Sequence, residues 1–205
     1  MEVLKQTKTK LGNIIQLLGN KNAKTLVIGV FHGDEPQGKF LIENYLKENN
    51  LSDKLMFITC LNPDGLQLKQ RTNSNGVDLN RNFPTKNWQL TDKNEFFGGE
   101  APQSEIETKF VVEILKEFKP ELILTLHAPF KVVNYDGPAK EIAEKISKII
   151  NYPVEENIGY PTPGSFGTYC GIERNIPVIT LELDEECPVE NLIKPVNEIF
   201  TELKS

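Results

Sequence analysis

Two histidines, His32 and His127, are the whole histidine content of the chain, and each follows a short apolar run typical of a buried strand. Glu35 comes three residues after His32. Two histidines and one glutamate are a recurrent ligand set for catalytic zinc, in which water takes the fourth position. Zinc held in this way polarises a carbonyl group and lowers the pKa of water. The three residues together favour a zinc-dependent hydrolase over two unrelated histidines at strand ends.

A second group of candidate residues lies in the polar segment 70–84. The planar guanidinium groups of Arg71 and Arg81 suit bidentate binding of a carboxylate. Asn80, beside Arg81, adds a second hydrogen-bond donor. For any single arginine, the plain alternative is a solvated basic loop. Asp78 in the same segment fits a turn or an ion pair better than a catalytic role.

Length and composition limit the classes of protein that the chain can represent. Its 205 residues are enough for one domain, which we expect to span residues 1–205. The net charge of −6, without a dense run of lysine or arginine, argues against general nucleic-acid binding. No apolar run approaches the roughly 20 residues that a membrane-spanning helix needs, so we expect no membrane partner.

The expected location of the protein is the cytoplasm. The N-terminal sequence lacks a basic segment followed by an apolar core, which a signal peptide would have. The cysteines at positions 60, 170 and 187 are odd in number and scattered. Such a distribution fits a reducing compartment better than a disulfide framework.

Apolar runs alternate with amphipathic segments along the chain. Strands are expected at residues 11–18, 26–31, 55–61, 122–126 and 178–183, and helices at residues 36–48, 106–118, 139–150 and 189–203. This alternation predicts an α/β layered fold with a mainly parallel sheet. Ligands of such folds bind at the carboxyl ends of the strands, which is where both histidines lie.

Local signals predict where several of these elements begin and end. Residues 62–65 have the composition of a turn, and Ser104 and Glu107 have the spacing of a capping box. Pro195 must kink or begin the last helix. Residues 66–100 form a long polar stretch, and such a stretch inside a compact domain is uncommon unless it is functional.

Several motifs in this order resemble the zinc metallocarboxypeptidases of the carboxypeptidase A type. The motifs are His32-Gly-Asp-Glu35, Asn62-Pro-Asp-Gly65, Gly76-Val-Asp-Leu-Asn-Arg-Asn-Phe-Pro84, His127 and Thr180-Leu-Glu-Leu183. The segment ending at Pro84 and the segment 159–167 resemble the bacterial murein peptide amidase branch more closely. The resemblance covers about residues 26–183 and implies a three-layer α/β/α fold around a central, mainly parallel mixed sheet.

The resemblance also implies the catalytic roles. It implies that His32, Glu35 and His127 bind one zinc ion per chain. It implies that Arg71 polarises the scissile carbonyl and stabilises the oxyanion. It implies that Glu182 is the general base that takes a proton from water and passes it to the leaving amine.

The substrate-binding roles implied by the resemblance involve three further residues. Asn80 and Arg81 are expected to hold the terminal carboxylate of the substrate, and Tyr160 to close over the substrate. An ordinary loop tyrosine beside prolines is the alternative for Tyr160. The acidic run 184–186 is expected to be a solvated edge, with attraction of an ammonium group as the alternative.

The chain also departs from the family pattern. It is much shorter than the pancreatic-type enzymes, which predicts trimmed loops around the cleft. No acidic residue follows Gly164 in the part of the loop that sets side-chain preference in some relatives. No motif in the sequence therefore identifies the residues that form the specificity pocket.

The resemblance predicts a zinc amidase that cleaves the γ-D-glutamyl–meso-diaminopimelate bond of murein tripeptide in peptidoglycan recycling. One alternative is an N-acyl amino acid deacylase of the succinylglutamate desuccinylase or aspartoacylase type. Another is a non-catalytic peptide-binding module that kept the fold. The sequence leaves the oligomeric state open, with a homodimer as one alternative.

Overall fold

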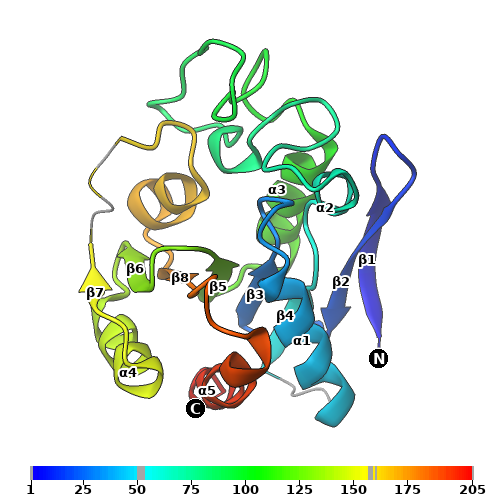
Figure 1. The fold of residues 1–205 in the computed structure, drawn as a ribbon. Coiled ribbons are helices and arrows are strands. Elements are labelled where there is room, and N and C mark those ends of the chain that lie inside the picture. The colour runs from blue at the N-terminus through cyan, green and yellow to red at the C-terminus, as the bar shows by residue number, and fades with distance from the viewer. Residues whose placement is uncertain (1, 50–53, 157–158, 160, 205) are drawn as a thin grey trace.

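The computed structural model describes residues 2–49, 54–156, 159 and 161–204, and a mixed β-sheet forms the centre of this part of the chain (Figure 1). Within these residues the sheet has eight strands in the order β1-β2-β4-β3-β5-β8-β6-β7. The strands are β1 (Val3–Lys8), β2 (Ile14–Gly19), β3 (Thr25–Gly29), β4 (Leu55–Ile58), β5 (Leu122–His127), β6 (Val132–Asp136), β7 (Val154–Glu155) and β8 (Val178–Glu182).

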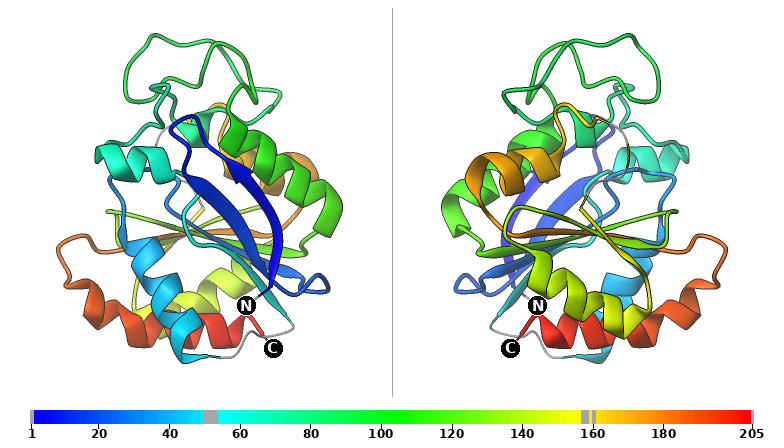
Figure 2. Two further views of the ribbon diagram at one scale, coloured as in Figure 1. Left: turned by 90° about the vertical axis from the view of Figure 1, so that its right-hand side faces the viewer. Right: turned by 90° about the vertical axis from the view of Figure 1, so that its left-hand side faces the viewer.

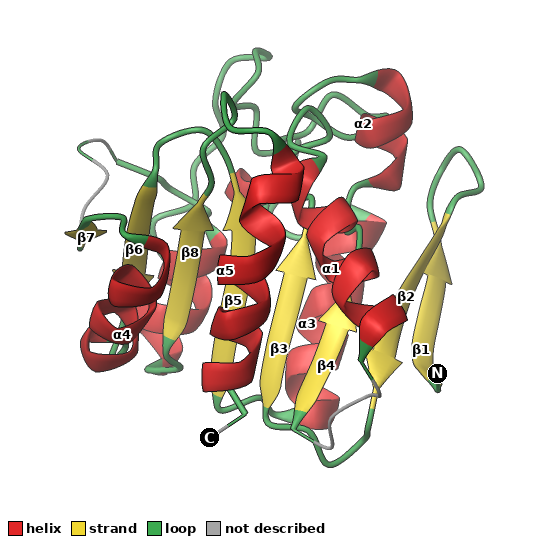
Figure 3. Ribbon diagram, turned by 60° about the horizontal axis from the view of Figure 1, so that its bottom comes forward, coloured by secondary structure: helices red, strands yellow, loops and turns green. Residues whose placement is uncertain are grey.

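The four central strands β4, β3, β5 and β8 run parallel to one another. On one side β2 joins β4 antiparallel, and on the other β6 joins β8 antiparallel. The prediction of a mainly parallel, mixed sheet is therefore confirmed for the centre. The parallel strands end at one edge of the sheet, where several loops and the short helix α2 lie (Figure 3).

Helices cover both faces of the sheet, so that the fold has three layers (Figure 2). The helical elements are α1 (Gln37–Glu48), α2 (Pro63–Leu68), η1 (Leu79–Arg81), α3 (Ile106–Phe118), α4 (Lys140–Ile150), η2 (Thr168–Ile172) and α5 (Val189–Glu202). One apolar core lies between the sheet and α1, α4 and α5. A second core lies between the sheet and α3 and η2. Because both faces are buried, central strands such as β3 consist of continuous apolar residues.

The predicted opening strand at residues 11–18 is wrong in its boundaries. The structure instead contains an antiparallel pair, β1 and β2, in which Lys8 is the partner of Ile14. Strand β1 is mostly exposed and carries Lys, Gln and Thr side chains, so it lacks the apolar period of a buried strand. Strands β6 and β7, on the far side of β8, were not predicted either, since β7 is short and β6 mixes polar and apolar residues.

Two predictions about local boundaries are also wrong, as is the alternative that Pro195 begins the last helix. Residues 63–68 form the helix α2, with Asn62 accepting a hydrogen bond from the Gly65 amide at 2.9 Å, instead of a simple turn. The expected capping box is absent, because Glu105 occupies the N-cap of α3 and Ser104 donates to the Glu105 carboxylate. Helix α5 begins before Pro195 and continues through it. Burial of its apolar face offsets the lost hydrogen bond there.

The long polar stretch is held together by asparagine side chains. Asn73 Oδ1 accepts hydrogen bonds from the amides of Asn75 and Val77, at 3.0 and 3.1 Å. Asn82 Nδ2 donates to the Gly98 carbonyl at 2.7 Å, and its Oδ1 accepts from the Glu105 amide. These bonds replace the regular ladder of a helix or strand, so a polar segment can keep one conformation.

No helix in the described part of the chain combines the length and the apolar character that crossing a bilayer demands.

Candidate metal centre and active site

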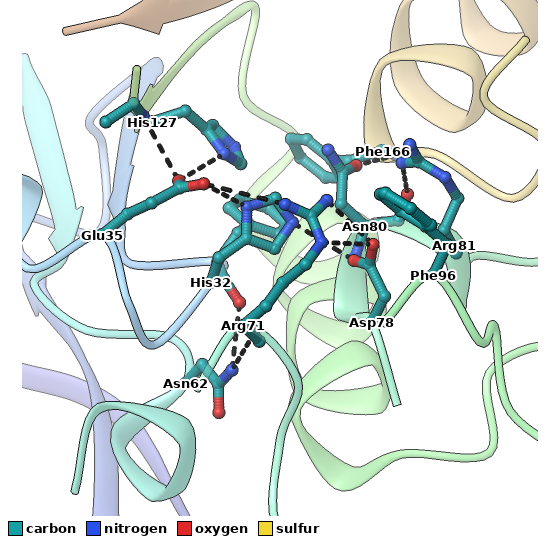
Figure 4. Close-up of polar contacts among 12 residues, drawn as sticks. His32, Glu35, Asn62, Arg71, Asp78, Asn80, Arg81, Phe96, His127 and Phe166 are labelled. Atoms are coloured by element: carbon teal, nitrogen blue, oxygen red, sulfur yellow. Dashed lines mark hydrogen bonds and ion pairs between the residues drawn. The ribbon is translucent and has the colours of Figure 1, made fainter. Parts of the chain in front are cut away.

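The predicted site residues meet at the carboxyl ends of the parallel strands. His32 lies just beyond the end of β3, and His127 is the last residue of β5. Glu182 is the last residue of β8, where its register partner on β5 is His127. Three neighbouring strands thus place polar side chains at one edge of the sheet, and Figure 4 shows two of these, His32 and His127.

His32, Glu35 and His127 form a compact group of potential metal ligands. One donor atom from each residue lies within 4.8 Å of the other two. Nδ1 of His32 is 2.7 Å from Glu35 Oε1, and Nδ1 of His127 is 3.1 Å from Glu35 Oε2. All three side chains are nearly inaccessible to solvent. This donor set fits zinc, because imidazole nitrogens and a carboxylate oxygen are its usual ligands at catalytic sites.

A tight turn positions Glu35 against the two histidines. The Glu35 amide donates to the His32 carbonyl at 3.2 Å, and the following Pro36 immediately precedes α1. The Ala128 amide donates to Glu35 Oε2 at 3.3 Å. Gly33 lies so close to the backbone of Gly65 that any side chain there would collide with it. The chain therefore needs glycine at position 33 to bring this turn against α2.

Asp78 connects the metal-ligand group to the arginine loop. Its Oδ1 lies 3.2 Å from Nε2 of His32, and its Oδ2 accepts from both Nε and Nη2 of Arg71, at 3.1 and 2.9 Å. Burial opposes ionisation of Asp78, but His32 and Arg71 hold its pKa well below the usual range. The expected pairing role of Asp78 matches these contacts. A carboxylate in this position fixes the tautomer of a metal-binding histidine.

The protonation of His32 reflects the two carboxylates that flank it. Burial lowers its pKa, but the charges of Asp78 and Glu35 outweigh burial and raise the pKa to about 9. The same imidazolium charge holds the pKa of Glu35 below its usual range despite burial. A divalent cation carries the positive charge that these carboxylates favour, and it would displace the proton from the imidazole nitrogen facing Glu35.

Glu182 is a buried carboxylate with an unused acceptor. It is 7% exposed, and its Oε2 has no hydrogen-bond partner among the described residues. Burial raises its pKa above the usual range. It shares a pocket with His32, Glu35 and His127. A desolvated carboxylate that keeps one oxygen free beside a metal-ligand group has the properties of a general base.

Asn80 and Arg81 line the same pocket as the metal-ligand group. Asn80 Oδ1 accepts from the Phe166 amide at 2.9 Å, and this contact leaves its two amide protons available. Arg81 Nη1 donates to the Asn80 carbonyl at 2.7 Å, so the guanidinium is held beside Asn80 (Figure 4). Adjacent amide and guanidinium donors in a pocket suit a carboxylate.

Two other expectations concern residues at the margin of the site. Tyr160 lies outside the described residues, so its expected role stays a prediction. In the acidic run 184–186, Asp184 forms an ion pair with Lys131 at 2.7 Å, while Glu185 and Glu186 are exposed. This arrangement is that of a solvated acidic edge.

The structure adds residues to the site that the sequence did not indicate. Asn62 Nδ2 donates to the carbonyls of Phe31 and Arg71, both at 3.2 Å, and thereby ties the end of β3 to the arginine loop. The ring of Phe96 lies 5.2 Å from the guanidinium carbon of Arg71. Asp136 lines the pocket from β6. The position of Asn62 at a strand end was a usable signal, whereas Phe96 and Asp136 belong to no recognisable motif.

Comparison with known proteins agrees with this geometry. The family model for zinc carboxypeptidases matches residues 6–153. Murein peptide amidase A of Escherichia coli (strain K12) is 32% identical over 170 residues, covering 77% of this chain and 69% of that protein. Murein peptide amidase A of Vibrio campbellii is 33% identical over 178 residues, covering 79% of this chain and 70% of that protein.

Solved structures match the fold over nearly the whole chain. The crystal structure of murein-tripeptide amidase MpaA from Escherichia coli O157 superposes with a TM-score of 0.84 at 26% identity, covering 97% of this chain and 90% of that one. Carboxypeptidase A from Helicoverpa armigera superposes with a TM-score of 0.75 at 15% identity, covering 98% and 68%, and shares the fold. The chain belongs to the zinc carboxypeptidase family and is a metallopeptidase.

Proposed function

We propose that the protein hydrolyses the γ-D-glutamyl–meso-diaminopimelate bond of murein tripeptide and serves in peptidoglycan recycling. The relatives named murein peptide amidase A support this substrate. The observation that carries the chemistry is the buried Glu182 carboxylate beside His32, Glu35 and His127, whose Oε2 has no hydrogen-bond partner among the described residues. The cytoplasmic location and the homodimer alternative stay predictions.

One zinc ion per chain is the proposed cofactor. His32, Glu35 and His127 would hold it, because their donor atoms already converge within 4.8 Å. The hydrogen bond that Nε2 of His32 donates to Asp78 would orient the imidazole, as second carboxylates do for many metal-binding histidines. When bound, zinc polarises the scissile carbonyl and acidifies water.

Glu182 is the proposed general base. Its free Oε2 takes a proton from the attacking water, and the same carboxyl then gives a proton to the nitrogen of the leaving amino acid. A pKa raised by burial suits both steps, since the group must accept the proton and later release it. The water adds to the amide carbon, the carbon–nitrogen bond breaks, and the products are a carboxylate and a free amine.

Arg71 and Arg81 are proposed to interact with two different negative charges, the developing oxyanion and the carboxylate of the leaving amino acid. Arg71 lines the pocket with the metal ligands and is fixed by two hydrogen bonds to Asp78, so that its guanidinium can stabilise the developing oxyanion. Asn80 and Arg81 bind the carboxylate of the leaving amino acid. Because hydrogen bonds already hold Asn80 and Arg81 in place, less side-chain conformational entropy is lost when the substrate binds.

The acyl part of the substrate has a separate cleft. A depression of about 560 Å³ begins at Glu35 and Arg71 and is bordered by the exposed rings of Phe96 and Phe130. It shares Glu35, Arg71 and Phe130 with the inner pocket, whereas Asn80 and Arg81 line the inner pocket and not this cleft. The L-alanyl-γ-D-glutamyl portion would occupy this cleft.

Turnover of three substrates by the zinc-loaded protein tests the proposal. We expect release of meso-diaminopimelate from murein tripeptide, detected by chromatography, and no turnover of N-succinylglutamate or N-acetylaspartate. Preference for either acylated amino acid would favour the deacylase alternative. Binding of murein tripeptide without turnover of any of the three would favour a peptide-binding module.

A further inference from the structure

The side chain of Asn62 is a fully buried polar group that no step of the proposed mechanism uses. It is 0% exposed and stands at the N-cap of α2, where its Oδ1 accepts a hydrogen bond from the Gly65 amide at 2.9 Å. Its Nδ2 donates to the carbonyls of Phe31 and Arg71, both at 3.2 Å. Both amide protons and the amide oxygen are therefore committed to the backbone of three separate segments.

The carbonyl of Arg71 is the point where the arginine loop meets the turn 32–35, which carries two of the proposed zinc ligands. Besides the bond from Asn62, this carbonyl accepts a hydrogen bond from the amide of Gly33, the second residue of the turn, at 3.2 Å. Figure 4 shows Asn62 beside Arg71 and His32. One backbone oxygen is thus held both by the turn and by Asn62, which fixes where the Arg71 side chain begins.

The other end of the Arg71 side chain is held by a different group. Its Nε and Nη2 donate to Oδ2 of Asp78 at 3.1 and 2.9 Å, and Asp78 Oδ1 lies 3.2 Å from Nε2 of His32. The guanidinium is therefore fixed only while both ends are held. If the backbone end loses the bond from Asn62, the side chain can pivot about its ion pair with Asp78.

Close packing around Gly65 limits how the Asn62 amide can move. A Cβ atom on Gly65 would lie 2.5 Å from Nδ2 of Asn62 and 2.5 Å from the carbonyl oxygen of Thr72. Glycine is unfavourable inside a helix such as α2, so the space that these two groups occupy explains the glycine. The amide and the arginine loop are packed against the helix, which leaves the Asn62 side chain little room to rotate.

We propose that Asn62 is a positioning residue that sets the place of the Arg71 guanidinium relative to the metal ligands. This inference rests on the proposed function, because it takes Arg71 to face the developing oxyanion. Asn62 does not line the inner pocket that the described residues form, so it acts through Arg71 and not on the substrate. A displacement of about 1 Å in a catalytic group can slow a reaction on the order of 100-fold.

The variant Asn62→Ser separates the two amide donors from the helix cap. Serine is a good N-cap residue, so α2 keeps an acceptor for its first amides, but one hydroxyl cannot donate to two carbonyls. For the zinc-loaded variant we expect kcat for murein tripeptide to fall by about 10–100-fold. KM should change little, because the oxyanion forms only in the transition state. Asn62→Asp, which also keeps a cap acceptor and nearly the same shape, should lower kcat in the same way.

A double-mutant cycle with Arg71→Ala distinguishes positioning from a merely structural role. Arg71→Ala keeps the backbone carbonyl that Asn62 binds and removes only the guanidinium. In that background Asn62→Ser should lower kcat by less than about twofold, since the group that it positions is gone. An equal loss in both backgrounds would overturn the inference, as would a wild-type kcat of Asn62→Ser alone. Ile146→Val, in the buried core beside α4, is the control for lost stability and should keep the wild-type kcat.

Hydrogen exchange of the Arg71 side chain separates this inference from the proposed function, because it needs no substrate. The chain has three arginines, at positions 71, 81 and 174, so the Arg71 Nε–H signal in a proton–nitrogen spectrum is assigned by its loss in Arg71→Ala. The bond to Asp78 slows exchange of this proton with water. We expect exchange to be about tenfold faster in Asn62→Ser and unchanged in Ile146→Val.

The two measurements together assign a failure to one proposal or the other. Faster exchange in Asn62→Ser would support the positioning of Arg71 even if murein tripeptide were not cleaved, and the missing cleavage would count against the proposed function. Cleavage of murein tripeptide by the wild type, with unchanged Arg71 exchange in Asn62→Ser, would support the proposed function and overturn the role of Asn62.

Discussion

His127 and Glu182 are register partners on the adjacent parallel strands β5 and β8. The Leu183 amide donates to the His127 carbonyl at 2.8 Å, so the hydrogen-bonded ladder continues past both residues. The proposed metal ligand and the proposed general base are thus positioned by the backbone of the sheet and not by a loop. Rigid elements hold catalytic groups more accurately than loops do.

The first prediction concerns the proton transfer assigned to Glu182. Glu182→Gln is nearly isosteric but cannot accept a proton, so turnover of murein tripeptide should fall by about 10²–10⁴-fold. Zinc content by elemental analysis and tripeptide binding by calorimetry should remain as in the wild type. A variant that turns over tripeptide at the wild-type rate would show that Glu182 is structural.

The central part of the fold could be predicted because buried parallel strands appear in the sequence as short, mostly apolar runs. Strands β3, β5 and β8 are apolar apart from one threonine each, β5 and β8 end in His127 and Glu182, and His32 follows shortly after β3. Helix α1 follows a proline. The predicted site residues that the structure describes lie in or next to one pocket, since each was tied to a strand end or a motif.

The remaining features depend on contacts between segments distant in the sequence. Asp136 is unremarkable as a sequence position, and its location in the pocket follows from pairing of β6 with β8 and from the room left by Gly167. Similarly, Glu107 was expected in a capping box, but it is buried at the start of α3, where Asn73 of the long polar stretch donates to its carboxylate.

A second prediction concerns the carboxylate that Arg81 is proposed to bind. Arg81→Ala should weaken transition-state binding of murein tripeptide by roughly 2–5 kcal/mol, the scale for removing one partner of a buried charged pair. Steady-state kcat/KM measures this loss. With a tripeptide whose terminal carboxylate is amidated, the loss should shrink sharply. Equal losses for both substrates would place the function of Arg81 elsewhere.

A third prediction concerns the support that Asp78 gives to His32. Asp78→Asn removes the charge that orients the imidazole and should weaken zinc binding by about 10–100-fold. Competition with a chelator of known affinity measures the change. Asp92→Asn, at an exposed position, is the matched control and should bind zinc like the wild type. An unchanged zinc affinity of Asp78→Asn would mean that Asp78 positions Arg71 but does not support zinc binding by His32.

The last prediction tests a buried carboxyl group remote from the metal ligands. Glu107 in α3 is 2% exposed, and burial, together with the charges of Glu105 and Asp64, raises its pKa to about 7. In the unfolded chain a glutamate ionises near pH 4.5. The folded state therefore binds a proton that the unfolded state has lost, and stability falls as the pH rises from about 4.5 through about 7.

Glu107→Gln keeps the shape of the side chain and removes this ionisation. We expect equal free energies of unfolding for wild type and variant at pH 4, and a variant more stable by about 2–3 kcal/mol at pH 8. Urea denaturation across this pH range measures the difference. Glu113→Gln, at an exposed position of the same helix, should show no such pH dependence. A difference between wild type and Glu107→Gln that stays constant from pH 4 to pH 8 would show that Glu107 does not titrate in this window.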